Sequence, residues 1–384
     1  TAKPLAAAVA LILLLSAGVI AQGEDANKLE LVRAHYETAQ ALERAGDWVK
    51  ATEEWSALLK LAPDDARAWT NLGVALNRQS KSSEALAAWS RAIEIDPKLA
   101  GAHFNVGLTL VKDSKYVEAV APLRRALALE PTNEAARRTL ALALIGSERF
   151  REATREIAQL LVRAPRDTGL LEMAAQNFMR QGRFQEAAVV LRRRVDIDPA
   201  SSSLWALYGD ALDGSARTPE ATAAYQKALE LDPESTQIRY GLGYLYWKLY
   251  RYEEAERELV EVLRRDSDNA SAAFTLGDLY LTKGMANQAQ PFLEKAAAAY
   301  PNEFDTRFAL GRALVLQGDL TRGIVELRAA VLLNGSIADG HYQLGRALMR
   351  TGAKDEARRE LDRARELQEQ RRSAEAERFL KKLP

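Results

Sequence analysis

Residues 66–99 read ARAWTNLGVALNRQSKSSEALAAWSRAIEIDPKL, and their pattern of apolar, small and proline residues predicts the fold. Apolar residues recur at intervals of three and four on both sides of a polar break near Ser80, which is typical of two amphipathic helices. Gly73 in the first segment and Ala85 in the second are small enough for the two helix backbones to approach closely. Pro97 cannot continue the hydrogen-bond ladder and ends the second helix. The stretch therefore predicts an antiparallel helical hairpin.

The same pattern recurs at a period of 34 residues from Val32 to Arg371 without an insertion, which makes ten repeats. In a repeat numbered from 1 to 34, position 8 is Gly or Ala, position 24 is large and apolar, and position 20 is Ala except at Gly323. Position 32 is proline in seven repeats. Position 34 can cap the next helix at six of the nine junctions, through Asp65, Asn133, Asp167, Ser201, Ser235 and Asn269. Because one hairpin is too small to bury its own apolar face, the repeats must stack on one another.

This pattern resembles the tetratricopeptide repeat family, whose signature the second repeat carries in Trp69, Leu72, Gly73, Leu76, Ala85, Trp89, Ala92 and Pro97. The resemblance implies an all-α fold, a right-handed α-solenoid of about ten helix-turn-helix repeats over residues 32–371. Residues 22–31 are then a linker and the start of the first helix. The family is a scaffold for binding proteins and peptides rather than one activity, so the resemblance implies a protein that is not an enzyme.

The second helix of the last repeat has no terminating proline, since Glu369 stands at position 32. Its helical pattern continues, and residues 372–384 are predicted to extend it as a highly charged C-terminal helix. Phe379, Leu380 and Leu383 are expected either to fold back on the last repeat or to offer a small contact of their own.

An uncharged apolar run extends from Leu5 to Ala21 behind Lys3, and a possible cleavage site precedes Gln22. Residues 1–21 are predicted to be a secretory signal peptide. The alternative is a single-pass membrane anchor, although a helix of this length spans about 25 Å against a hydrocarbon core of about 30 Å. We therefore expect an exported protein of the bacterial envelope, periplasmic or anchored in the inner membrane. It would contact the membrane only through this segment, if the segment is not cleaved.

Composition and charge exclude several classes of function. There is no cysteine, which excludes disulfides, thiolate zinc sites and cysteine nucleophiles. The 53 basic residues balance the 53 acidic ones, which argues against a nucleic-acid partner. His35, His103 and His341 all occupy position 4, in repeats one, three and ten, where Trp69 and Trp205 also occur. That placement favours a structural wedge between helices over metal ligation. We predict no catalytic residues, no metal and no cofactor.

The inner surface is the remaining functional candidate. The family resemblance implies that first helices line a concave face through positions 2, 5, 9, 12 and 13. In the last four repeats these positions gather aromatic and arginine side chains, which are the residue types that dominate binding hot spots. The predicted partner-binding groove consists of Tyr240, Tyr244, Trp247, Phe274, Asp278, Phe308, Arg312, Tyr342 and Arg346. The alternative for the aromatic residues at position 5 is that they only pad neighbouring helices.

The predicted function is a non-catalytic interaction scaffold of the cell envelope that binds a peptide or helix of a partner protein on this face. The alternative is a permanent structural subunit of a larger envelope assembly, which would use convex surfaces and the C-terminal helix.

Overall fold

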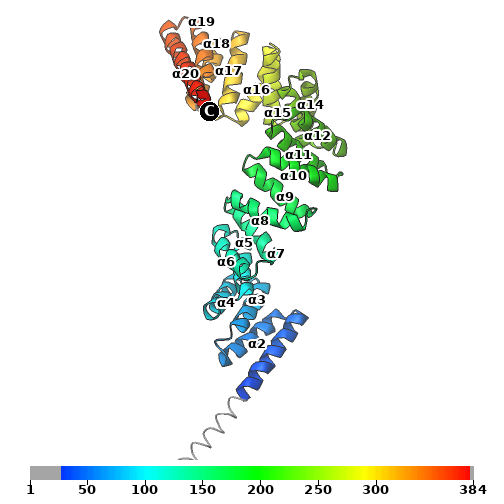
Figure 1. The fold of residues 1–384 in the computed structure, drawn as a ribbon. Helices are drawn as coiled ribbons and strands as arrows, with labels where there is room; N and C mark the ends of the chain where they lie inside the picture. Colours follow the sequence, from blue (N-terminus) through cyan, green and yellow to red (C-terminus); the bar gives the residue numbers. More distant parts are fainter. Residues whose placement is uncertain (1–26, 381–384) are drawn as a thin grey trace, which may run out of the picture. The chain divides into compact units, whose positions relative to one another are not determined.

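The computed structural model describes residues 27–380, and within this range all regular structure is helical. A helix over residues 27–45 opens the first repeat. The first helices of the later repeats are α3 (Ala66–Arg78), α5 (Ala100–Lys112), α7 (Glu134–Gly146), α9 (Thr168–Arg180), α11 (Ser202–Gly214), α13 (Thr236–Lys248), α15 (Ala270–Thr282), α17 (Phe304–Gln317) and α19 (Ala338–Thr351). The second helices are α2 (Trp48–Leu61), α4 (Ser82–Ile95), α6 (Tyr116–Leu129), α8 (Phe150–Arg163), α10 (Phe184–Ile197), α12 (Thr218–Leu231), α14 (Tyr252–Arg265), α16 (Ala286–Ala299), α18 (Leu320–Leu333) and α20 (Lys354–Leu380). The predicted helix-turn-helix repeats are confirmed (Figure 1).

The last helix is also longer than its equivalents, as expected from the missing proline: α20 has 27 residues, whereas α18 has 14. The predicted signal peptide or anchor at residues 1–21 lies outside the described residues. So does Leu383, and so do the side chains of Phe379 and Leu380.

By its internal contacts the chain divides between Arg183 and Phe184 into an N-terminal body and a C-terminal body. In the N-terminal body each helix from α2 to α9 packs on the next, and the first helices α3, α5 and α7 also touch in sequence. In the C-terminal body each helix from α10 to α20 packs on the next, and α13, α15, α17 and α19 touch in sequence. Each body therefore has a face built from consecutive first helices.

The turn inside every repeat depends on one residue with a left-handed backbone at position 15. Five of these residues are glycine, which adopts positive φ without strain: Gly46, Gly182, Gly284, Gly318 and Gly352. The other five have a side chain and φ near 60°: Ser80, Ser114, Glu148, Ala216 and Tyr250. A left-handed residue with a Cβ atom costs roughly 1–2 kcal/mol. The tertiary packing of the hairpin therefore imposes the same turn where the local sequence does not favour it.

The small residues at positions 8 and 20 have the predicted packing role. A Cβ atom at Gly73 would lie 2.3 Å from the indole nitrogen of Trp89, the residue at position 24 of the same repeat. A Cβ atom at Gly107 would lie 2.4 Å from Leu123, again at position 24. Ala85 and Ala119, at position 20, are fully buried. Position 8 is small because the large side chain at position 24 of the partner helix occupies the space beside it.

Local capping defines where many first helices begin. All six residues predicted as caps accept a hydrogen bond from a backbone N–H in the first turn of the following helix, namely Asp65, Asn133, Asp167, Ser201, Ser235 and Asn269. The remaining three junctions end in Leu99, Glu303 and Ile337, which make no such bond. Such a bond typically stabilises a helix by about 1 kcal/mol.

Position 4 joins most repeats to the one before them through a polar contact, which revises the expected wedge. The side chain at position 4 donates to the backbone carbonyl at position 32 of the preceding repeat in seven junctions, through Trp69, His103, Arg137, Trp205, Arg239, Arg307 and His341. In several repeats it also contacts the glutamate at position 23, as His341 does with Glu360 at 2.5 Å. His103 and His341 therefore serve the same structural purpose as the arginines and tryptophans, whereas His35, in the first repeat, contacts Glu54 at 2.6 Å.

Candidate functional site

The nine predicted site residues all lie on first helices of the C-terminal body. Tyr240, Tyr244 and Trp247 are on α13, Phe274 and Asp278 on α15, Phe308 and Arg312 on α17, and Tyr342 and Arg346 on α19. They occupy positions 5, 9 and 12 of consecutive repeats whose first helices touch in sequence. The structure thus brings them to one surface, which we call the aromatic face.

The aromatic rings of α13 form a row along the helix, in which the first pair is tilted and the second pair is stacked. Tyr240 and Tyr244 are four residues apart, and their ring centroids are 6.4 Å apart. Tyr244 stacks on Trp247 with centroids 5.6 Å apart and an interplanar angle of 29°. Tyr244 is 37% exposed, whereas Tyr240 and Trp247 are half-buried. Neighbours at i+3 and i+4 on a helix meet on one face, so the sequence itself builds this row.

The arginines of the aromatic face lie over aromatic rings one helical turn before them. The guanidinium carbon of Arg312 is 5.5 Å from the ring centroid of Phe308, and that of Arg346 is 5.7 Å from the ring centroid of Tyr342. Such cation–π contacts attract the guanidinium to the face of the ring. Tyr342 and Arg346 are exposed, and Arg312 is half-buried.

Asp278 contributes the negative charge of the aromatic face. Its burial raises the pKa of the carboxyl group, while the charge of Arg312 and hydrogen bonding from Trp247 act in the opposite direction. Asp278 on α15 therefore interacts with α13 on one side and α17 on the other. Burial also raises the pKa of Tyr240.

The aromatic residues at position 5 are partly packing residues, as the alternative interpretation expected. Phe308 packs against a buried cluster that includes Ile324 and Leu327, and it stacks on Phe304 with ring centroids 5.2 Å apart. Phe274 and Tyr240 are half-buried. Among the predicted aromatic residues, Tyr244 and Tyr342 are therefore the most available to a ligand.

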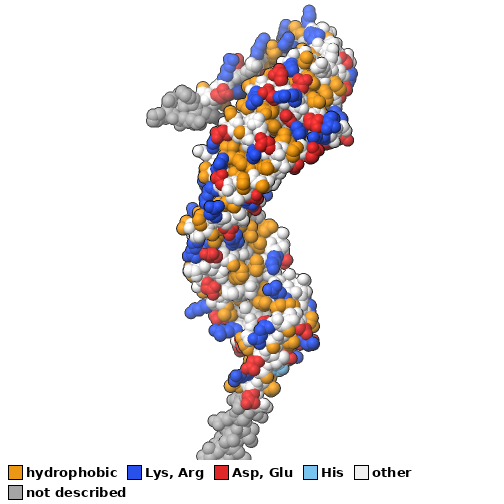
Figure 2. Space-filling view, turned by 90° about the vertical axis from the view of Figure 1, so that its right-hand side faces the viewer, with side chains coloured by type: hydrophobic (Ala, Val, Ile, Leu, Met, Phe, Trp, Pro, Cys, Tyr) orange, Lys and Arg blue, Asp and Glu red, His pale blue; other side chains and the backbone are white. Residues whose placement is uncertain are grey.

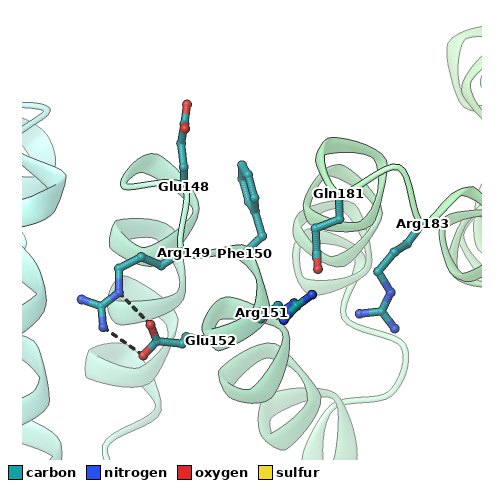
Figure 3. A pocket seen from close by; sticks show the side chains of 7 residues that line it. All are labelled: Glu148, Arg149, Phe150, Arg151, Glu152, Gln181 and Arg183. Carbon is teal, nitrogen blue, oxygen red and sulfur yellow. Dashed lines mark hydrogen bonds and ion pairs between the residues drawn. The ribbon is translucent and has the colours of Figure 1, made fainter.

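Sequence reasoning did not point to a pocket of about 690 Å³ at the turns of the fourth and fifth repeats. Its lining residues are Glu148, Arg149, Phe150, Arg151, Glu152, Gln181 and Arg183 (Figure 3). Arg149 turns to Glu152 with an ion pair of 2.7 Å, away from the side chains of Glu148 and Phe150. This pairing lowers the pKa of Glu152, which stays a charged structural partner instead of a general acid.

The search for aromatic residues at positions 5, 9 and 12 also missed the equivalent surface of the N-terminal body. Positions 9 and 12 there carry aliphatic residues, such as Leu108 and Leu142. Reading hydropathy at these positions, instead of ring content, would have found this surface.

No other chemistry is evident in the part of the chain that the structure describes. Within residues 27–380 no group of three or more His, Cys, Asp or Glu side chains could hold a metal ion. Over the same range no helix combines the length and the hydrophobicity needed to cross a bilayer. Figure 2 shows acidic, basic and hydrophobic side chains interspersed over the surface in view.

Comparison with protein families gives matches to two models, both described as tetratricopeptide repeat. One matches residues 110–176, 214–279 and 250–304, and the other matches residues 36–100, 78–134 and 308–372. Together these matches span well over half of the chain. No curated protein sequence matches.

Solved structures with the same kind of fold include a tetratricopeptide repeat protein from Parabacteroides merdae. It is 17% identical, with a TM-score of 0.50, and the match covers 69% of this chain and 98% of that chain. YrrB, a protein described as having an unusual peptide-binding site, is 24% identical with a TM-score of 0.42, over 46% of this chain and 92% of that chain. The Cut9–Hcn1 hetero-tetramer of APC/C matches at 13% identity and a TM-score of 0.48, over 86% of each chain. At these identities the likenesses concern the fold alone.

Proposed function

The chain belongs to the tetratricopeptide repeat family, a family of non-catalytic scaffolds that bind peptides and proteins, and on that premise we propose that its aromatic face binds a peptide or helix of a partner protein. The observation that carries this proposal is the arrangement of that face. The stacked pair Tyr244 and Trp247 lies beside Asp278, and two arginines lie over rings of the next two repeats.

Several properties of the aromatic face suit a ligand. Tyr, Trp and Arg are the residue types that dominate binding energy at protein interfaces. Because the rings are already stacked on one another, little side-chain freedom is lost when a ligand covers them. The guanidiniums of Arg312 and Arg346 can donate hydrogen bonds to carboxylates or carbonyls of that ligand.

The test is binding of a peptide library to the full chain and to a Tyr244→Ala/Trp247→Ala variant. Tyr250 and Tyr252 lie in the same repeat, at its turn and on α14, with ring centroids 6.1 Å apart. A Tyr250→Ala/Tyr252→Ala variant is therefore a control that removes two aromatic rings in edge-to-face contact elsewhere in the repeat. We expect the first variant to lose binding and the control to keep it. Equal binding by all three proteins would remove the aromatic face as the site.

A permanent structural subunit is the second candidate, and the exposure of the second helices favours it. Val162 on α8 and Leu332 on α18 are 83% and 87% exposed, and α20 is largely exposed from residue 365 to residue 377. Co-purification with one partner at fixed stoichiometry, unaffected by Tyr244→Ala/Trp247→Ala, is the result that would favour this function over the first.

We further propose that the protein is exported and works in the bacterial envelope, either in the periplasm or anchored in the inner membrane. The apolar run from Leu5 to Ala21 supports this proposal. Fractionation of cells followed by N-terminal sequencing tests it. A mature chain that begins at Gln22 in the periplasmic fraction indicates cleavage, and an intact N-terminus in membranes indicates an anchor. An intact chain in the cytoplasmic fraction would contradict export.

A further inference from the structure

The N-terminal body has an apolar surface on its first helices that is chemically different from the aromatic face. Position 9 is Val74 on α3, Leu108 on α5 and Leu142 on α7, and position 12 is Val111 on α5 and Ile145 on α7. These three helices touch in sequence, so the five side chains share one surface. Leu142 is 43% exposed and the other four are half-buried. We call this surface the aliphatic face.

A row of cations follows one edge of the aliphatic face. Position 13 is Arg44, Arg78 and Lys112 in the first three repeats, and all three side chains are exposed. Within residues 27–380, none of the three makes an ion pair with a carboxylate within 4.0 Å, although Arg78 lies over the Trp48 ring at 5.5 Å. Other arginines of the same body are paired, as Arg137 is with Glu156 at 2.6 Å.

The ends of the first helices explain only part of this row. Cations near a helix C-terminus are favoured by the helix dipole, typically by about 0.3–1 kcal/mol each. That effect explains a basic residue at position 13, but it does not explain the aliphatic side chains beside that residue. A row of unpaired positive charge next to an apolar strip calls for a ligand that supplies both acidic and apolar groups.

We propose that the aliphatic face binds an amphipathic helix of a partner protein, with aliphatic residues on Leu108 and Leu142 and acidic residues along Arg44, Arg78 and Lys112. The spacing suits a helix, because packed helices lie about 8–10 Å apart and a helix advances about 10 Å in seven residues. Each heptad of the ligand can therefore repeat its contacts on the next first helix.

A protein ligand fits this surface better than a membrane does. Four of the five aliphatic side chains are half-buried between neighbouring helices, so they line the surface and do not protrude from it. Insertion into a bilayer requires exposed apolar side chains on a projecting element. The proposal does not depend on the aromatic face, because that face belongs to the other body.

The test uses three synthetic peptides of about 21 residues, three heptads each. One has a leucine seam flanked by glutamates, the second has lysines in place of the glutamates, and the third is the acidic peptide broken by central prolines. Binding to the full chain is measured by fluorescence anisotropy. We expect the acidic helix to bind about tenfold more tightly than the basic one, since three exposed ion pairs of ordinary strength sum to that effect.

Two protein variants make the test specific. Arg44→Glu/Arg78→Glu/Lys112→Glu should reverse the preference between the acidic and basic peptides. The control variant, Lys81→Glu/Lys98→Glu/Lys115→Glu, reverses the charge of three exposed lysines in the neighbouring turns and junctions. It should leave the preference between the two peptides unchanged. Leu142→Ser should weaken the binding of both helical peptides, whereas Tyr244→Ala/Trp247→Ala should weaken the binding of neither.

Several outcomes would overturn the proposal. If both helical peptides bind equally, or if neither binds, the basic row does not select an acidic ligand. If the reversed variant loses thermal stability without changing its preference, the cations serve only the helix ends. Equal binding of the proline-broken peptide would mean an extended ligand, and displacement of the acidic peptide by phosphatidylglycerol vesicles would mean a membrane surface.

Discussion

Arg239 provides the sharpest test of how neighbouring repeats are held together. It stands at position 4 of the seventh repeat, where its Nη2 donates to the Pro233 carbonyl oxygen at 2.9 Å and its Nη1 contacts Glu258 Oε2 at 2.6 Å. The Arg239 and Glu258 side chains are only 15% and 21% exposed. Arg239→Met keeps most of the apolar stem and removes both contacts. The contact with Pro233 links the seventh repeat to the sixth, and the contact with Glu258 joins the two helices of the seventh repeat.

The expected cost follows from those contacts. A hydrogen bond from a charged donor contributes about 1.5 kcal/mol or more. Leaving Glu258 without a partner adds about 1–2 kcal/mol, below the 3–5 kcal/mol of a fully buried pair because water still reaches this carboxylate. The Arg239 Nε atom is buried without a hydrogen-bond partner in the described structure, and its removal returns part of this cost. We therefore expect a net loss of about 2–3 kcal/mol.

Native-state hydrogen exchange of the α13 and α14 amides is the appropriate assay, because repeat arrays open locally at a weakened interface. Arg251→Met is the matched control in the same repeat. Arg251 pairs with Glu254 at 2.7 Å and lies over the Tyr246 ring at 4.6 Å, but its side chain is 46% exposed, so the loss should stay at or below about 1 kcal/mol. In Arg239→Met/Glu258→Leu neither charge is left without a partner. The double variant should therefore lose less stability than the two single variants lose in sum. If Arg239→Met lowers the free energy of unfolding no more than Arg251→Met does, the polar contacts at position 4 do not hold the repeats together.

Three further predictions concern packing, turns and pH. Gly73→Ala should lower the free energy of unfolding by about 1–3 kcal/mol, because the new methyl group meets Trp89. Gly101→Ala should raise it by about 0.5–1 kcal/mol, because nothing lies within 4 Å of the Cβ position there. Urea unfolding followed by circular dichroism measures both changes. Ala216→Gly should raise stability by up to about 1 kcal/mol in the same assay, since it relieves a left-handed residue with φ of 61°; a loss would show that the turn is not strained. Burial raises the pKa of Asp278 above its ordinary value of 3.8, so the folded state holds this proton more tightly than the unfolded state does. The stability contributed by this group therefore falls as pH rises from 3.8 through the raised pKa. Asp278→Asn should therefore stabilise the protein at neutral pH and lose this advantage below pH 3.8, and an advantage that does not change with pH would refute the assignment.

Much of the candidate site could be predicted from the sequence because it depends on helical periodicity. Positions 5, 9 and 12 of one helix lie on one face, so Tyr240, Tyr244 and Trp247 had to meet once α13 was recognised. The contribution of Asp278 could not be predicted in this way, since its pKa depends on groups from α13 and α17. The aliphatic face was missed because the prediction looked for rings, although Leu108 and Leu142 stand at the same repeat positions.

The hairpin, the period and most helix starts follow from the amino-acid sequence alone, because these features depend on contacts between residues close in the chain. Small residues such as Ala85 permit close helices, prolines end them and residues such as Asp65 cap them. The left-handed backbone of Tyr250 could not be predicted in this way, since packing of the whole hairpin must outweigh its local preference. Packing between repeats also gives Trp69, His103 and Arg137 the same contact despite their different chemistry. The division between Arg183 and Phe184 falls inside a repeat, where the 34-residue period continues without change. It reflects the sum of contacts over many residues, which no local pattern records.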